Sequence, residues 1–88
     1  MRLIWDEVAW TDYVTWQSED GKIAVRINLL IRECLRTPFT GIGKPEPLRH
    51  ELKGYWSRRI DAEHRLVYRV SGIAGAQSLE IIQCRFHY

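Results

Sequence analysis

Three side chains of the kinds that perform acid–base chemistry on a phosphate stand out in the sequence. They are Glu46, Arg65 and His87. A carboxylate can act as a general base, a guanidinium can stabilise charge on a phosphate, and an imidazolium can act as a general acid. Cleavage of RNA without a metal ion needs all three roles, because the ribose 2′-hydroxyl is deprotonated and the leaving 5′-oxygen is protonated. Metal-independent RNA cleavage is therefore the first hypothesis.

The setting of each group also allows a simpler interpretation. Glu46 lies between Pro45 and Pro47, whose rings restrict the loop and would hold the carboxylate at low entropic cost. A solvated loop glutamate fits the composition equally well. Arg65 is also interpretable as an exposed strand arginine, and His87, one residue from the end, as a surface histidine. These alternatives stay open on the residues alone.

Other kinds of chemistry find no support in the sequence. It contains no phosphate-binding Walker loop, no dinucleotide fingerprint and no zinc-binding spacing. The three histidines, His50, His64 and His87, are scattered along the chain. We therefore expect neither a metal site nor a cofactor.

The charge is distributed unevenly along the 88 residues, whose net charge is +2. Residues 1–43 carry five Lys or Arg against six Asp or Glu, whereas residues 44–88 carry eight against five. An excess of cations in the second half suits a nucleic-acid-binding face. A mildly basic domain without any such partner has the same charge.

The first half of the chain predicts one short strand and two helices. Residues 2–5 form the strand, and Asp6 is a suitable N-cap for a helix that runs to about Gln17. Gly21 breaks that helix. A second helix has apolar residues at helical spacing from Ile23 to Leu35, and Thr37 with Pro38 ends it.

The second half changes to an alternating pattern after a loop rich in glycine and proline at residues 37–47. Four strands are predicted, at residues 48–52, 56–61, 64–71 and 78–88. Helices followed by strands indicate an α+β fold. We expect residues 1–88 to form a single domain, with two N-terminal helices packed on one face of a twisted, mainly antiparallel β-sheet.

Strand alternation predicts which side chains lie on the sheet face that the helices leave open. In the last strand Ile82, Cys84 and Phe86 should face the helices, and their neighbours should face away. The same argument makes five basic residues converge on the open face: Arg49, Arg65, Arg69, Arg85 and His87. The arginines that we expect to contact RNA are Arg49, Arg58, Arg59, Arg69 and Arg85.

The two cysteines indicate a reducing compartment. Cys34 falls in a helical apolar pattern and Cys84 in a strand, so we expect both to be unpaired core residues. The sequence starts without a signal peptide and has no apolar run long enough to span a membrane. We therefore expect a cytoplasmic protein with no membrane partner.

Several segments together resemble one known family over essentially the whole chain. The segments are Leu3–Trp5, Thr37–Phe39, Gly41–Leu48, Gly54–Ile60, Glu63–Tyr68 and Cys84–Tyr88. They are similar to the Txe/YoeB family of toxins, within the wider RelE-like group, whose fold resembles that of microbial ribonucleases. Each segment alone is a weak signal, but the combination is highly specific.

The resemblance implies a bacterial mRNA interferase that enters the ribosomal A site and cuts the codon there. Glu46 matches the family's general base, Arg65 the phosphate-stabilising residue and His87 the general acid, while Tyr88 matches a residue that orients the RNA. Arg49 stands where the family pattern has lysine. The turn at residues 72–78 is longer than the family's, away from these positions.

The resemblance also implies partners: a YefM-like antitoxin, the ribosome with its mRNA, operator DNA only through the antitoxin complex, and a second copy of the chain in a homodimer. Two other functions stay open. The chain could inhibit translation by occupying a ribosomal site without catalysis, or act with its partner as a DNA-binding co-repressor. RNA cleavage that disappears in Glu46 or His87 variants, while ribosome binding survives, would separate the first function from the others.

Overall fold

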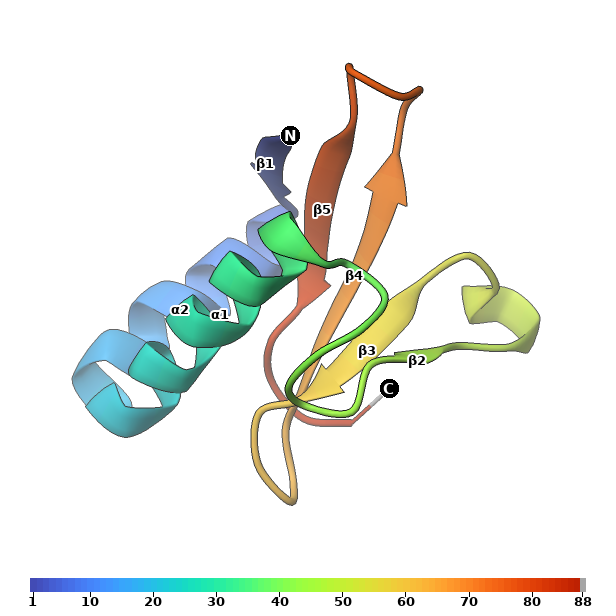
Figure 1. The fold of residues 1–88 in the computed structure, drawn as a ribbon. Coiled ribbons are helices and arrows are strands. Elements are labelled where there is room, and N and C mark those ends of the chain that lie inside the picture. The colour runs from blue at the N-terminus through green and yellow to red at the C-terminus, as the bar shows by residue number, and fades with distance from the viewer. Residues whose placement is uncertain (88) are drawn as a thin grey trace.

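The computed structural model describes residues 1–87, which form two layers (Figure 1). One layer holds helices α1 (Glu7–Glu19) and α2 (Gly21–Arg36). The other is a sheet of five strands with one short 3-10 helix, η1, beside it. The strands are β1 (Arg2–Trp5), β2 (Glu46–Pro47), β3 (Trp56–Arg59), β4 (Arg65–Ser71) and β5 (Ser78–Gln83), and η1 spans His50–Leu52.

Two aspartates define the helix ends. The Asp6 side chain accepts a hydrogen bond from the Val8 N–H at 3.1 Å and caps α1. Asp20 ends α1, and its side chain caps α2 by accepting from the Lys22 N–H at 3.1 Å. The predicted break at Gly21 therefore lies at Asp20, and Gly21 is the first residue of α2. This single-residue connection turns the helices into an antiparallel pair (Figure 1).

The sheet has the strand order β1-β5-β4-β3-β2. β1 runs parallel to β5, and the other neighbours are antiparallel. The helices bury residues such as Ile27 and Leu30 against Leu66, Tyr68 and Ile81 of the sheet. Burying each aliphatic side chain contributes roughly 1.5–3 kcal/mol. The predicted α+β fold, with the helices on one face of a mainly antiparallel sheet, is confirmed.

The strand predicted at residues 48–52 is wrong. The strand at this position is the short β2, which ends at Pro47, and η1 follows it. His50 adopts a φ of +57°, in the left-handed region, so the chain turns there and cannot continue as a strand. Leu48 still donates its N–H to the Tyr55 carbonyl at 2.9 Å, which closes the turn between β2 and β3.

The last strand is shorter than predicted and its alternation is interrupted. Val67 lies opposite Gln83 but Tyr68 lies opposite Ile81, so Ile82 is an extra residue in β5. Ile81 and Cys84 are consequently both fully buried, whereas Ile82 is only partly buried. The strand ends at Gln83, and Phe86 adopts a φ of +62°. The assignment of residues 84–87 to this strand is therefore wrong, and Phe86 is exposed instead of packed under the helices, whereas Cys84 is buried against α1 as predicted.

Both cysteines are buried and unpaired, as predicted. Burial raises the pKa of both thiols, to about 12 for Cys84, which lowers the fraction of reactive thiolate at neutral pH. We expect both thiols to resist iodoacetamide in the native protein and to react quickly in guanidinium chloride. Mass spectrometry of the alkylated chain measures this, and rapid modification of the native protein at Cys84 would contradict the buried environment.

Neither helix in residues 1–87 has the length and apolar character needed to cross a membrane.

Candidate active site

The register of the sheet brings the predicted general base and phosphate ligand to one face. Glu46 of β2 lies opposite Ser57 of β3, which lies opposite Val67 of β4. Arg59 lies opposite Arg65 on the same two strands. Directly opposed residues, and residues two apart on one strand, share a face. Glu46, Arg59 and Arg65 therefore lie on the face that points away from α1 and α2.

This face is more closed than the sequence predicted. Ser57 is 1% exposed and Val67 2% exposed, although both point away from α1 and α2. Glu46 and Arg59, in contrast, are exposed. The exposed polar side chains Glu46 and Arg59 therefore lie on β2 and β3, beside the buried residues Ser57 and Val67. The face is not the open basic surface that the sequence predicted.

The loop before β2 fixes the position of Glu46. The Gly43 carbonyl accepts a hydrogen bond from the Arg59 N–H at 2.6 Å, which ties the loop to β3. Gly43 has a φ of +82°, and a Cβ there would lie 2.8 Å from a methyl carbon of Leu30. Only glycine permits both the backbone conformation and the close approach. The Pro45–Glu46–Pro47 segment then forms the sheet edge, where missing proline N–H groups are tolerated.

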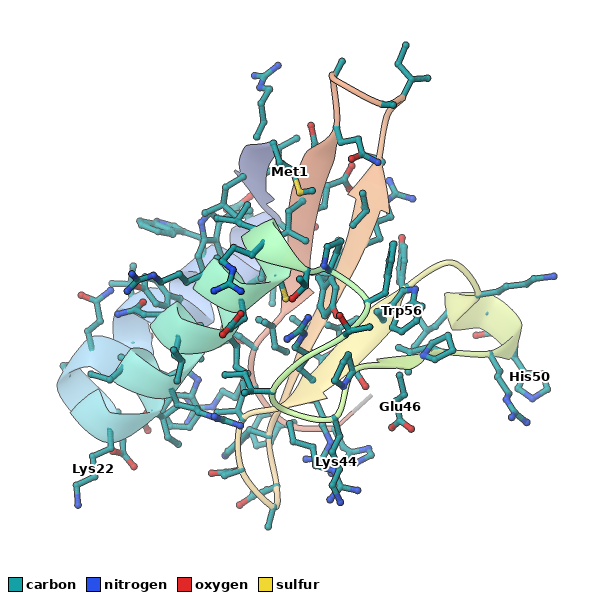
Figure 2. The ribbon with its side chains drawn as sticks, in the orientation of Figure 1. Met1, Lys22, Lys44, Glu46, His50 and Trp56 are labelled. Atoms are coloured by element: carbon teal, nitrogen blue, oxygen red, sulfur yellow. The ribbon has the colours of Figure 1, made fainter. Side chains whose placement is uncertain are left out.

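A cavity of about 450 Å³ opens next to Glu46. Its lining consists of Glu46, Pro47, Leu48, Arg49, His50 and Leu52. Figure 2 shows the side chains of Glu46 and His50 projecting to the same side of the β2–η1 segment. Arg49 is exposed at the start of η1, so its expected place on a strand face is wrong, but it does lie beside Glu46.

Arg65 is buried, with only 8% of its surface exposed, which corrects the expectation of an exposed strand arginine. Its Nη1 donates to the carbonyls of Asp61 at 2.8 Å and His64 at 3.1 Å. Within residues 1–87, its Nε and Nη2 make no hydrogen bond. The guanidinium is thus held through one nitrogen and keeps further donors for an anion.

A tight turn before β4 supports this arginine. The Asp61 carboxylate accepts from the N–H groups of Glu63 at 2.8 Å and His64 at 2.7 Å. Burial raises the pKa of Asp61, but the hydrogen bonds from the His64 and Glu63 N–H groups and the nearby charge of Arg65 outweigh it, so the pKa is lowered overall. Asp61 therefore stays ionised at neutral pH and keeps the turn closed.

Arg85 lies on the helix side of the molecule and not on the predicted open face. Its guanidinium forms an ion pair with Glu19 at 2.7 Å and lies 4.1 Å from the ring centroid of Trp16, both residues of α1. The hydrogen bond from Arg85 lowers the pKa of Glu19. The side chain turns this way because β5 has already ended at Gln83. Its expected role in binding RNA is therefore not supported by its position.

The chain beyond β5 returns to the start of β4. Arg65 donates its N–H to the Phe86 carbonyl at 3.0 Å. His87, the next residue, is exposed. The structure thus brings the segment that carries the predicted general acid to the backbone of the predicted phosphate ligand. Tyr88, the predicted RNA-orienting residue, lies outside the described residues.

Arg58 is fully buried, so the expectation that it contacts RNA is wrong for this structure. It lies opposite Leu66, on the helix side of the sheet. Its guanidinium donates to the Tyr68 hydroxyl at 3.1 Å and to three carbonyls of the loop after α2, those of Thr37, Thr40 and Ile42. Alternation places Arg58 on the same face as Trp56 and Ile60, a signal that was present in the sequence.

We expect Arg58→Met to destabilise the fold by about 3 kcal/mol or more, because it removes the hydrogen bonds of a buried guanidinium to the Tyr68 hydroxyl and to three loop carbonyls. In a domain of this size that loss lowers the melting temperature by roughly 10 °C or more. The control is Arg59→Met, since Arg59 is exposed on the neighbouring position. Thermal melting of the two variants measures the difference, and equal melting temperatures would refute a structural role for Arg58.

Arg69 keeps its predicted place on the face away from the helices. It pairs with Glu80 at 3.0 Å across β4 and β5, and its guanidinium lies 5.3 Å from the Tyr55 ring centroid. The hydrogen bond from Ser71, followed by the one from Arg69, lowers the pKa of Glu80. With 43% of its side chain exposed, Arg69 stays available to a polyanion, as does Arg59.

Sequence reasoning missed the residues that hold the site together, above all His64. Its ring is buried, and its Nδ1 accepts a hydrogen bond from the Phe86 N–H at 2.7 Å. His64 was predicted as the first residue of a strand, but its contact with the segment after β5 is non-local and leaves no pattern in the sequence. Across residues 1–87, no three His, Cys, Asp or Glu side chains gather as a metal site would require.

Comparisons with known proteins identify the family of the chain. A sequence model of the YoeB-like toxin of bacterial type II toxin–antitoxin systems matches residues 5–88. Over 88 residues, 100% of both chains, the sequence is 56% identical to Toxin YoeB of Escherichia coli (strain K12).

Solved structures give the same result. The YoeB/ParE toxin from Agrobacterium tumefaciens superimposes with a TM-score of 0.97 at 59% identity, over 100% of both chains. The heterotetrameric YoeB–YefM toxin–antitoxin complex from Staphylococcus aureus contains a chain with a TM-score of 0.87 and 39% identity, over 100% of this chain and 98% of that one. Since the family model matches residues 5–88 and the similarity in sequence and fold covers the full chain, the protein belongs to the YoeB-like toxins of bacterial type II toxin–antitoxin systems.

Proposed function

We propose that this toxin is a metal-independent endoribonuclease that cleaves mRNA in the ribosomal A site and so inhibits translation. The observation that carries the proposal is the register of β2, β3 and β4, which gives Glu46, Arg59 and Arg65 one face while the Phe86 carbonyl binds the Arg65 backbone. The proposed base Glu46 and the cations Arg59 and Arg65 therefore share one face, and the segment that carries the proposed acid is bound next to Arg65.

Each group has a defined role in the proposed reaction. Glu46 removes the proton from the ribose 2′-hydroxyl, and the oxygen attacks the adjacent phosphorus. Arg65 stabilises the charge on the non-bridging phosphate oxygens through its remaining donors. The bond from phosphorus to the 5′-oxygen breaks as His87 gives that oxygen a proton. The products are a 2′,3′-cyclic phosphate and a 5′-hydroxyl, and Tyr88 orients the RNA.

The remaining cations bind the substrate. Arg49 lies beside Glu46 in the cavity lining, and Arg59 and Arg69 lie on the face away from the helices. Their guanidinium groups contact phosphates of the message and of ribosomal RNA, which makes binding sensitive to salt. Arg58 instead stabilises the loop after α2, and Arg85 binds the segment after β5 to α1.

The toxin also acts within an assembly. The S. aureus relative was solved as a YoeB–YefM heterotetramer and as a YoeB dimer. On that basis we propose a YefM-like antitoxin as the partner of this chain, a homodimer as its free form, and operator binding only through the antitoxin complex. The antitoxin neutralises the toxin by displacing the catalytic C-terminal end.

The test of the function is primer extension on an mRNA translated in vitro, after addition of the purified toxin. We expect new 3′ ends within the codon of the A site, and end-group analysis should find 2′,3′-cyclic or 3′-phosphates. Translation that stops while every transcript stays intact would reject the proposal in favour of inhibition by occupancy.

Because the proposed nucleophile is the ribose itself, the reaction should need no metal ion. We expect residual cleavage of a ribosome-free RNA to be unchanged by EDTA. The ribosome is left out because its own structure needs magnesium. Loss of this cleavage with EDTA and its return with a divalent cation would count against the proposed chemistry.

A further inference from the structure

We infer that His64 is a positioning residue whose ring nitrogen Nδ1 holds the chain terminus so that His87 can donate its proton. The inference rests on the proposed function, since the place of His87 matters only if His87 takes part in the reaction.

The ring of His64 is enclosed by its neighbours. The residue is 7% exposed, and its ring packs edge-on against Trp16, with ring centroids 4.8 Å apart. The backbone N–H of His64 donates to the Asp61 carboxylate at 2.7 Å, and its backbone carbonyl accepts from the Ile60 N–H at 3.0 Å. A side chain fixed by both its backbone and its ring is a rigid support for whatever binds it.

The hydrogen bond to the terminus has a defined direction. The Phe86 backbone N–H donates to Nδ1 at 2.7 Å, and a backbone N–H can only donate. The bound ring is therefore neutral, with its proton on Nε2, which lies 3.9 Å from a carboxylate oxygen of Glu63. Nδ1 is available to Phe86 because the ring carries its proton on the other nitrogen.

Phe86 is held on both of its backbone polar groups by two consecutive residues. Its N–H binds the His64 ring, and its carbonyl accepts from the Arg65 N–H at 3.0 Å. β5 has ended three residues earlier, and Phe86 has a φ of +62°, which is unfavourable for a side chain of this size. The clamp thus replaces the lost strand pairing and maintains the left-handed turn.

The clamp ties the proposed acid to the proposed phosphate ligand. His87 follows Phe86 directly, and Arg65 follows His64, so one pair of hydrogen bonds sets the distance between the two functional segments. Displacement of a catalytic group by about 1 Å can slow a reaction roughly 10²-fold. We therefore expect loss of the Nδ1 acceptor to lower the rate of the bound complex and to leave substrate binding almost unchanged.

The experiment compares His64→Leu with His64→Asn in single-turnover cleavage on programmed ribosomes. Leucine and asparagine have the same branched shape and both remove the ring, but only asparagine keeps an acceptor near the position of Nδ1. We expect the leucine variant to lose about 10²-fold in maximal rate, with an unchanged half-saturating concentration, and the asparagine variant to retain most of the rate. A leucine variant as fast as the wild type, or two equally slow variants, would overturn the inference.

A second measurement needs neither a variant nor RNA. In the wild-type toxin labelled with ¹⁵N, a scalar coupling across the N–H···N bond should connect the Phe86 amide with the ring of His64, and this amide should exchange slowly with solvent. Absence of the coupling with fast exchange would overturn the clamp even if the leucine variant does not fold. A wild-type toxin that shows the coupling but does not cleave mRNA would instead reject the proposed function.

Discussion

Glu46→Gln and His87→Gln should each reduce single-turnover cleavage on programmed ribosomes by about 10²–10⁴-fold, the usual contribution of one general base or acid. Glutamine keeps the size of each side chain but cannot accept or release a proton in the needed range. Both residues are exposed, so neither change creates a cavity, and the melting temperature should stay the same. Thermal melting beside the kinetics separates loss of chemistry from loss of fold.

The matched control for the base is Glu51→Gln. Glu51 is also exposed and lies in η1, five residues after Glu46, but it does not line the cavity. We expect this variant to cleave at the wild-type rate. If the Glu46 variant cleaves as fast as this control, Glu46 is not the base, and a different residue must deprotonate the 2′-hydroxyl.

Binding of the message in the ribosome should strongly raise the efficiency of cleavage, which is the second large effect that we expect. The toxin offers one small face, with Ser57 and Val67 buried at its centre and its exposed cations near the margins. Such a surface can bind phosphates but cannot bend a free strand to bring the 2′-hydroxyl in line with the scissile bond. Good positioning can supply roughly 7–11 kcal/mol of a barrier, and the ribosome would provide much of it by holding the codon.

We therefore expect kcat/KM for one message to be higher by several orders of magnitude in a programmed ribosome with an open A site than in free solution. The measurement uses the same RNA in both states at the same salt concentration, because phosphate contacts depend on salt. Arg59→Gln and Arg69→Gln should weaken binding in the ribosome and reduce its dependence on salt. Equal efficiency on free and bound message would show that the toxin orders its own substrate.

The sequence predicted the elements well where the pattern was long and regular. The helical spacing from Ile23 to Leu35 matches α2, and the alternation through Leu66 and Tyr68 matches β4. These features are local, because each follows from side chains repeatedly buried on one face. The layer order followed from them, since two amphipathic helices must cover an apolar sheet face.

The errors arose where a single residue interrupts a pattern. Alternation placed Ile82, Cys84 and Phe86 on the helix side, but of the three only Cys84 is buried, because Ile82 is an extra residue in β5 and the strand ends at Gln83. A bulge depends on the partner strand, so the sequence of β5 alone does not reveal it. His50 similarly ends β2 through its positive φ, a conformation for which histidine gives only a weak signal.

The candidate site was predictable in its residue types but not in its support. Alternation placed Arg65 on the face away from the helices, but Glu46 was expected in a loop and reaches that face because β2 pairs with β3. The burial of Arg65 depends on the Asp61–His64 turn. Arg58 was assigned to RNA because it is charged, although its neighbours Trp56 and Ile60 place it on the apolar side. Charge alone is a poor guide to exposure when a guanidinium finds several carbonyl acceptors.

The pairing of β1 with β5 affects how the chain folds during its own synthesis. Arg2 lies opposite Ser78, so the first strand to be translated waits for the last one. Contacts between such distant positions form slowly, because closing a long loop costs entropy before pairing repays it. β1 therefore lacks its partner strand while the residues before β5 are being synthesised, and the edge of the sheet can form only once β5 is available.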